Sequence, residues 1–257
     1  MKWINVRDYE AMSALAAARM FAVISGKAQA GKLVNIGLAT GNTMIRTYAI
    51  LAEMLNKSGT DLSRLTTFNL DEYVGLDGCN VESSHPLSYR AYMREKLLDK
   101  LNPELGLRPD RIMFPDAMNA AGYDKEIAAA GGIDFQLLGI GFNGHIAFNE
   151  PIPESAITSD EFCGLPSRVV NLARRTLETN ASLTAGNDIN LVPAKAATMG
   201  MSSIMQAREI MLLACFAAQA VPLRRIKTGR VTPEIPASCL LKHPACTIVC
   251  TADKIAI

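Results

Sequence analysis

Residues 38–43 read Leu-Ala-Thr-Gly-Asn-Thr, a composition that could bind an anion. Small side chains would let a ligand approach the backbone. If a helix follows, its free N–H groups and the positive end of its dipole would favour a negative charge. The alternative is an ordinary glycine turn in which Thr43 caps the helix, and this segment alone favours the turn. It is not a Walker loop, because no Gly-Lys-Ser/Thr follows it.

Two other segments carry groups suited to proton transfer. Asp71 and Glu72 follow the predicted strand of residues 65–70, and such a pair is either a solvated strand edge, the commoner case, or a base for proton abstraction. A glycine-rich stretch leads through Gly141 to His145, with a carboxylate five residues further on, at Glu150. A histidine in that setting favours acid–base chemistry over a packing role.

These segments follow stretches that predict secondary structure. Mostly apolar runs of strand length, bounded by turn signals, predict strands at residues 33–38, 65–70, 134–140, 209–215 and 246–250. Apolar residues near 3.6-residue spacing predict helices at residues 9–24, after Thr43, and at 86–101. Residues 151–166 contain three prolines and little periodicity, so we expect a loop there.

Strands separated by helices predict an α/β fold with a Rossmann-like, doubly wound, mostly parallel sheet and helices on both faces. The short and mostly apolar strands agree with burial on both faces. Ligands of such sheets bind outside the carboxyl ends of the strands, where the three chemical segments would meet. No repeat or linker interrupts residues 1–257, which we interpret as one domain.

Composition narrows the class of protein further. The chain has 257 residues, 26 Lys and Arg against 25 Asp and Glu, and a net charge of +1, so a broad basic surface for nucleic acid is not expected. No charge-free apolar stretch reaches the roughly 18–20 residues that a membrane span needs. The six cysteines show no C-x-x-C spacing, so we expect no metal site and reduced, mostly buried thiols in a cytoplasmic protein.

Two longer motifs resemble the signatures of glucosamine-6-phosphate deaminases. Residues 67–76 read Thr-Phe-Asn-Leu-Asp-Glu-Tyr-Val-Gly-Leu, and residues 144–151 read Gly-His-Ile-Ala-Phe-Asn-Glu-Pro. The segment 38–43 resembles the phosphate-side loop of that family, and the resemblance extends from about Leu33 to Val249. The related 6-phosphogluconolactonases tend to follow Gly-His with Ala-Ser-Leu-Phe-Pro, so the sequence after His145 favours the deaminase branch.

The resemblance implies an enzyme that converts glucosamine 6-phosphate, or a related hexosamine 6-phosphate, and water to a ketose 6-phosphate and ammonia, without a cofactor or a metal. It implies that Asp71 moves a proton between C2 and C1, that His145 assists ring opening, and that Glu150 tunes the charge of that imidazole. Asn143 stands where many members have Asp and is kept in the catalytic set. The residues expected to bind this amino-sugar phosphate are Ala39, Thr40, Gly41, Asn42, Thr43 and Gly141. The family contains monomers and hexamers, which leaves a homo-oligomer open.

The sequence departs from the family on the phosphate side. Gln219 stands at the position of a family Lys, and Ser182 at that of a family Arg. A phosphate dianion without both cations would lose several kcal/mol, at about 1.5–3 kcal/mol per charged hydrogen bond. Other cations could substitute, and the sequence does not choose among Arg46, Arg174, Arg175, Arg224, Arg225 and Lys227.

Two further functions remain open from the sequence. Lactone hydrolysis of the gluconolactonase kind needs activated water and no carbon-acid base, so the retained pair Asp71 and Glu72 argues against it. A non-catalytic sugar-binding regulator would explain the missing Lys and Arg, but it would have no need for Asp71.

Overall fold

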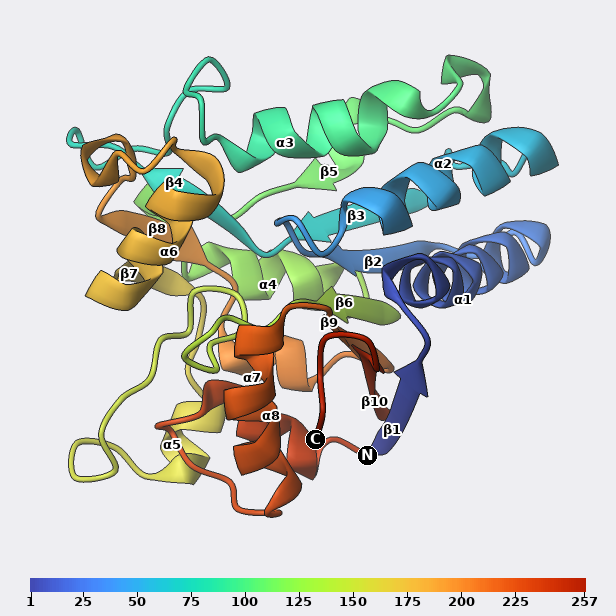
Figure 1. Ribbon diagram of the computed structural model, residues 1–257. Helices are drawn as coiled ribbons and strands as arrows, with labels where there is room; N and C mark the ends of the chain where they lie inside the picture. Colours follow the sequence, from blue (N-terminus) through green and yellow to red (C-terminus); the bar gives the residue numbers. More distant parts are fainter.

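The computed structural model describes residues 1–257 and is built on a seven-stranded sheet in which every neighbouring pair of strands is parallel (Figure 1). This confirms the predicted α/β class and its parallel sheet. In spatial order the strands are β1 (Lys2–Val6), β10 (Cys246–Thr251), β9 (Ile210–Ala214), β6 (Phe135–Leu138), β2 (Val34–Leu38), β3 (Leu65–Asn69) and β5 (Ile112–Met113).

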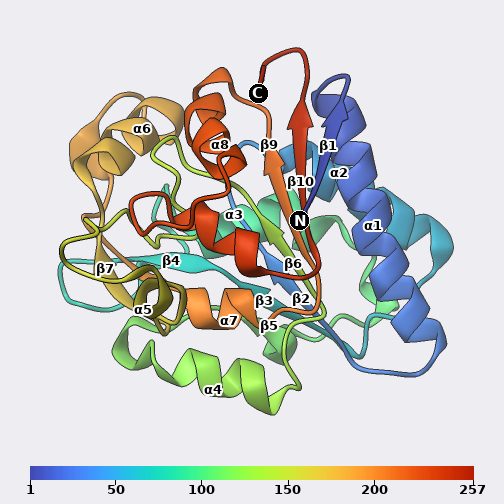
Figure 2. The ribbon, with the colours of Figure 1, turned by 90° about the horizontal axis from the view of Figure 1, so that it is seen from below.

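Helices cover both faces of this sheet (Figure 2). Strands β2, β3, β6 and β9 are buried along their whole length, which a sheet achieves only when both faces are covered. The helices are α1 (Tyr9–Gln29), α2 (Ile45–Ser58), α3 (Tyr89–Lys96), α4 (Gly122–Ala129), α5 (Ser159–Cys163), α6 (Arg174–Thr184), α7 (Met201–Met205) and α8 (Ala220–Lys227). Helices α1 and α2 lie on one face, and α4 and α7 lie on the other.

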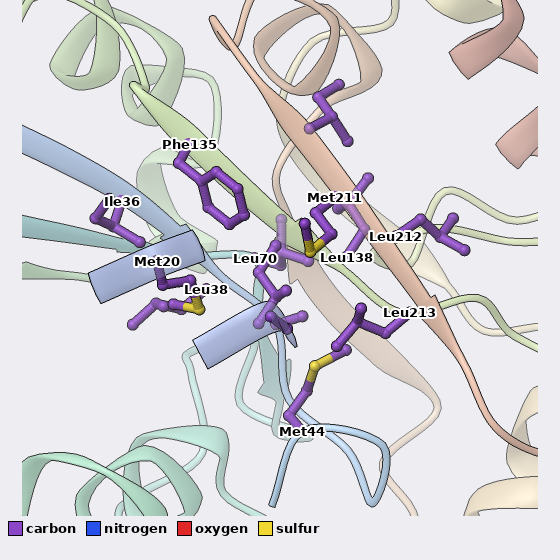
Figure 3. Close-up of a cluster of buried hydrophobic side chains, with 14 of the residues drawn as sticks. Met20, Ile36, Leu38, Met44, Leu70, Phe135, Leu138, Met211, Leu212 and Leu213 are labelled. Atoms are coloured by element: carbon purple, nitrogen blue, oxygen red, sulfur yellow. The ribbon is translucent and has the colours of Figure 1, made fainter. Parts of the chain in front are cut away.

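Apolar side chains of the central strands and the flanking helices form one large buried cluster. Figure 3 shows Leu38 of β2, Leu138 of β6 and Leu213 of β9 within it, together with Met20 of α1. All four are at most 1% exposed. At about 25 cal/mol for each Å² of apolar surface removed from water, such burial holds the strand ends in fixed positions.

A second, smaller sheet lies beyond the carboxyl ends of the first and was not predicted from the sequence (Figure 1). It is antiparallel and consists of β4 (Asp71–Val74), β8 (Lys195–Thr198) and β7 (Arg168–Asn171). Its strands are only four residues long, too short for an alternating pattern to be distinctive. Strand β4 follows β3 after one residue, so the chain passes directly from the large sheet into the small one at Asp71.

Three expectations about helices need correction. Thr43 does not cap α2, because Met44 already has helical dihedral angles at the N-cap and no side chain caps it. The helix expected at 86–101 is shorter, because Ser88 caps it and its regular turns end at Lys96. The loop expected at 151–166 contains α5, which Thr158 and Glu161 begin with a reciprocal capping box.

The prediction of reduced cysteines is wrong for one pair. Cys163 and Cys239 form a disulfide with their Cα atoms 5.8 Å apart, and it joins α5 to the 3-10 helix Pro236–Lys242. The two residues are 76 positions apart, so their spacing in sequence carried no sign of the pairing. The remaining cysteines are free, and of these Cys246 and Cys250 are buried, as expected. No helix is long and apolar enough to cross a membrane.

Candidate active site

A pocket lies outside the carboxyl ends of β2, β3, β6 and β9, bounded on another side by α6. The structure brings the sequence-predicted residues together there. Nine of them line the pocket, namely Ala39, Thr40, Gly41, Asn42, Thr43, Asp71, Gly141, Asn143 and His145. The tenth, Glu150, stands behind the imidazole of His145.

Asp71 is buried where the two sheets meet, which rules out the interpretation of this carboxylate as part of a solvated strand edge. Its Oδ1 accepts hydrogen bonds from the Thr198 hydroxyl and from the backbone N–H of Phe148, the latter at 3.1 Å. Its Oδ2 accepts none from the protein, which leaves that oxygen for a ligand. Burial raises the pKa of Asp71 to about 7, although both hydrogen bonds and the nearby His145 lower it.

Glu72, next in sequence, has a structural task. It is fully buried, and its two carboxylate oxygens accept hydrogen bonds from the backbone N–H groups of Tyr73, Tyr89 and Arg90 and from the Ser88 hydroxyl. Three of these donors belong to the beginning of α3, where a negative charge also complements the helix dipole. The pair of carboxylates is therefore divided, with Asp71 at the pocket and Glu72 anchoring α3.

The turn from Gly141 to Glu150 positions the imidazole of His145. Its Nδ1 lies 3.4 Å from Glu150 Oε2, and the Thr176 hydroxyl lies 3.4 Å from the same nitrogen. Asn143 links both ends of this arrangement, because its Nδ2 donates to Glu150 Oε2 at 2.8 Å and its Oδ1 accepts from the His145 backbone N–H at 3.2 Å.

Glu150 stays negatively charged in this setting. Burial on its own would raise the pKa of Glu150, but the hydrogen bond and positive charge of His145, with Thr176 and Asn143, outweigh it and lower the pKa to about 2. Glu150 is the one carboxylate within 4.0 Å of the imidazole nitrogens. Asn143 therefore supplies the geometry of the pair without adding a second negative charge.

Backbone strain in the same turn links His145 to Asp71. Ala147 has a φ of +51°, a left-handed conformation that costs a non-glycine residue on the order of 1 kcal/mol. The next backbone N–H, that of Phe148, donates to Asp71 Oδ1 and to the Thr198 hydroxyl. The strained residue thus lies between the imidazole and the donor that holds the carboxylate.

The loop of residues 39–43 carries backbone donors with no partner inside the protein. The N–H groups of Thr40, Gly41, Asn42 and Thr43 make no intramolecular hydrogen bond, while the Met44 N–H closes the turn onto the Gly41 carbonyl. Gly41 has a φ of +106°, which only glycine adopts easily. Four free N–H groups at the edge of a pocket suit an oxyanion.

The two positions where the family resemblance places cations are occupied differently. Gln219 is buried, and both of its polar atoms are hydrogen-bonded, because its Oε1 accepts from the N–H groups of Cys215 and Phe216 and its Nε2 donates to the Ile140 carbonyl. It therefore joins the loops that follow β9 and β6. Ser182 is exposed on α6 and does not line the pocket.

Several residues at or beside the pocket escaped sequence reasoning. Thr198 contacts Asp71, and Thr176 contacts His145, but both lie far away in sequence within segments that gave no signal. Phe142 and Phe216 meet edge to face at the pocket wall with ring centroids 6.1 Å apart. Nowhere do three or more His, Cys, Asp or Glu side chains form a group that could hold a metal ion.

Comparison with known proteins adds family evidence to this geometry. Residues 7–149 match the model of the family described as glucosamine-6-phosphate isomerases/6-phosphogluconolactonase. The chain belongs to this family. A glucosamine-6-phosphate deaminase of Rhodopirellula baltica is 43% identical over 83% of this chain and 80% of its own length. Another from Lachnoclostridium phytofermentans is 39% identical over 97% of this chain and 99% of its own.

Solved structures of the glucosamine-6-phosphate isomerase/6-phosphogluconolactonase family separate its two branches. A monomeric glucosamine-6-phosphate deaminase superposes with a TM-score of 0.86 at 30% identity, covering 99% of this chain and 98% of its own. A 6-phosphogluconolactonase from Trypanosoma cruzi superposes with a TM-score of 0.69 at 18% identity, covering 97% and 94%, and shows the shared fold alone. The predicted resemblance to the deaminases is confirmed.

Replacing Gly141 should displace the imidazole of His145. A Cβ at residue 141 would lie 2.3 Å from His145 Cε1, closer than any non-bonded contact permits. We expect Gly141→Ala to lose about 1–3 kcal/mol of folding stability and to shift the imidazole resonances of His145. Thermal unfolding and NMR spectra measure these two effects.

Gly139→Ala is the matched control, because its Cβ would only touch Met44 Cε at 3.4 Å in the same pocket. Gly141→Ala spectra that keep the His145 resonances in place would contradict the role assigned to this glycine.

The raised pKa of Asp71 should make folding stability depend on pH in a definite direction. Between about pH 4 and pH 7 the folded protein keeps a proton that the unfolded chain has lost, so stability falls as the pH rises. Asp71→Asn does not titrate, and its amide oxygen can still accept the same hydrogen bonds. We therefore expect the melting temperature of Asp71→Asn, minus that of the wild type, to increase from pH 4.5 to pH 8.

Asp99→Asn, at an exposed carboxylate, serves as the control for this pH series. A constant difference in melting temperature between Asp71→Asn and the wild type across the range would show that Asp71 is ionised throughout.

Proposed function

We propose that this protein is a hexosamine-6-phosphate deaminase and isomerase. It would convert glucosamine 6-phosphate, or a close relative such as galactosamine 6-phosphate, and water to a ketose 6-phosphate and ammonia, with residues 1–257 acting as one domain. The observation that carries the proposal is a buried carboxyl group, Asp71, with a pKa of about 7, in one pocket with the His145–Glu150 pair. Deaminases among the relatives support it.

Ring opening is the first step that the pocket would assist. Opening moves one proton from the hydroxyl on C1 to the ring oxygen and gives the open-chain aldehyde. His145 would carry that proton, because an imidazole gains and loses a proton near neutral pH. The negative Glu150, 3.4 Å from Nδ1, would stabilise the protonated imidazole, and Asn143 would hold the two in register.

Proton transfer between C2 and C1 is the second step, and it falls to Asp71. The carboxylate would take the proton from C2 while the oxygen on C1 gains one from solvent, which gives an enolamine. Returning the proton to C1 gives an iminium at C2. A base whose pKa lies near the working pH performs both halves well, since it neither holds the proton too tightly nor binds it too weakly.

Release of ammonia completes the sequence. Water adds to the iminium carbon C2 and passes one of its protons to the nitrogen, the C2–N bond breaks to release ammonia, and the remaining hydroxyl on C2 returns a proton to solvent to leave the ketose. Every change is a proton transfer, an addition of water or the breaking of a C–O or C–N bond that a proton transfer assists, which is chemistry for acid–base side chains such as those in the pocket. The free N–H groups of residues 40–43 would bind the sugar phosphate, while Ala39 and Gly141, whose own N–H donates to the His145 carbonyl, would line the same pocket.

Removing the base should stop turnover without stopping binding. We expect Asp71→Asn to lower the rate of ammonia release from glucosamine 6-phosphate by at least about 1000-fold, while affinity for fructose 6-phosphate changes only a few-fold. The reason is that the carboxylate acts in the chemical step. Coupled detection of ammonia measures the rate, and calorimetry measures the affinity.

Wild type and Asp99→Asn should release ammonia equally, because Asp99 is exposed and outside the pocket. Near-native turnover by Asp71→Asn would remove Asp71 from the mechanism. Hydrolysis of 6-phosphogluconolactone without ammonia release from any hexosamine phosphate would replace this proposal by the lactonase function.

A further inference from the structure

Arg175 is the one lysine or arginine side chain that lines the pocket. It lies in the first turn of α6, and the pocket-lining residues of that helix recur at one-turn spacing, at 175–176, 179–180 and 183. This spacing keeps one face of the helix toward the pocket. Ala181 anchors α6 on another side, where it belongs to the buried cluster that includes Tyr73 and Ala196 of the small sheet. Figure 1 shows α6 beside that sheet.

The other cations that the sequence left open are engaged elsewhere, and none of them lines the pocket. Arg46 makes an exposed ion pair with Glu10, and Arg225 makes one with Glu234. The remaining three are engaged as follows: Arg174 pairs with Glu178, Arg224 donates to the Ala256 carbonyl, and Lys227 donates to the Ile257 carbonyl.

Arg175 differs from these cations in having no partner. Its guanidinium takes part in no ion pair and donates no hydrogen bond within the protein, although the adjacent Arg174 bonds Glu178 at 2.7 Å. The exposed arginine fork of Arg175, at the edge of the pocket and without a partner in the protein, is available for a planar or tetrahedral oxyanion.

The charges around the rest of the pocket make this cation necessary for an anionic ligand. The other groups at the pocket that can carry a charge near neutral pH are Asp71, His145 and, behind the imidazole, Glu150, because burial raises the pKa of the lining Tyr89 well above 10.0. Phe142, Phe216 and the hydrogen-bonded Gln219 form a neutral wall. Without Arg175, the two carboxylates would repel a phosphate dianion, and the imidazole of His145 would be the one side chain able to attract it with a positive charge.

We propose that Arg175 binds the phosphate of the sugar and sets the preference for phosphorylated over neutral amino sugars, with the free N–H groups of residues 40–43 as further donors. The inference rests on the function proposed above and specifies its substrate class. It assigns the charge that the family resemblance places at 219 and 182 to a third position, on the same helix as Ser182.

The test separates KM from kcat in four proteins, the wild type, Arg175→Gln, Arg175→Lys and Arg174→Gln. For ammonia release from glucosamine 6-phosphate, we expect Arg175→Gln to raise KM about 10- to 100-fold, the size of one charge-assisted hydrogen bond, with kcat within a few-fold. Arg175→Lys should recover part of that loss. Arg174→Gln should match the wild type, because Arg174 points its charge at Glu178.

Calorimetry with fructose 6-phosphate and with fructose distinguishes a failure of this inference from a failure of the proposed function. If no protein releases ammonia, but Arg175→Gln weakens fructose 6-phosphate binding about 10-fold or more and leaves fructose unaffected, Arg175 is the phosphate ligand of a site with another reaction. The inference would be overturned if wild type and Arg175→Gln had equal KM for glucosamine 6-phosphate and equal affinity for fructose 6-phosphate. It would also be overturned if the wild type bound neither of these two sugar phosphates.

Discussion

The site depends on keeping the carboxyl group of Asp71 out of water while its side chain still faces a ligand. Burial alone would make the charged form costly, and the Thr198 hydroxyl and the Phe148 N–H offset part of that cost. As a result, Asp71 can both lose and regain its proton near neutral pH. The two sheets meet at this point, because β3 of the large sheet ends two residues before Asp71, and Asp71 begins β4 of the small sheet, where it pairs with Thr198 of β8.

Most of the large sheet was predictable because its strands are buried on both faces. Such strands read as short apolar runs, and the runs ending near Leu38, Asn69 and Leu138 all proved to be strands. The small sheet was not predictable, since four-residue strands such as Arg168–Asn171 owe their conformation to pairing with distant partners. Pairings across long stretches of chain, like Cys163 with Cys239, likewise leave no local trace.

The positions of the candidate site residues followed from one rule and one resemblance. Parallel strands bring their carboxyl ends to one edge, so residues 39–43, Asp71 and His145 had to lie near each other. The separate roles of neighbouring residues could not be predicted from the sequence. For example, Glu72 anchors α3, whereas Asp71 lines the pocket. These roles depend on the direction in which each side chain points where the two sheets meet. In the same way, the orientation of α6 places Arg175 at the pocket and Arg174 beside Glu178.

The most direct test of this account is an NMR titration of the aspartate carboxyl carbons in the protein labelled with ¹³C-aspartate. The resonance absent from Asp71→Asn identifies Asp71 without reference to any substrate. We predict that this resonance titrates with a midpoint at about pH 7, well above the ordinary aspartate value of 3.8. A midpoint below about pH 5 would mean that Asp71 is an ordinary carboxylate, and the mechanism built on it would fail.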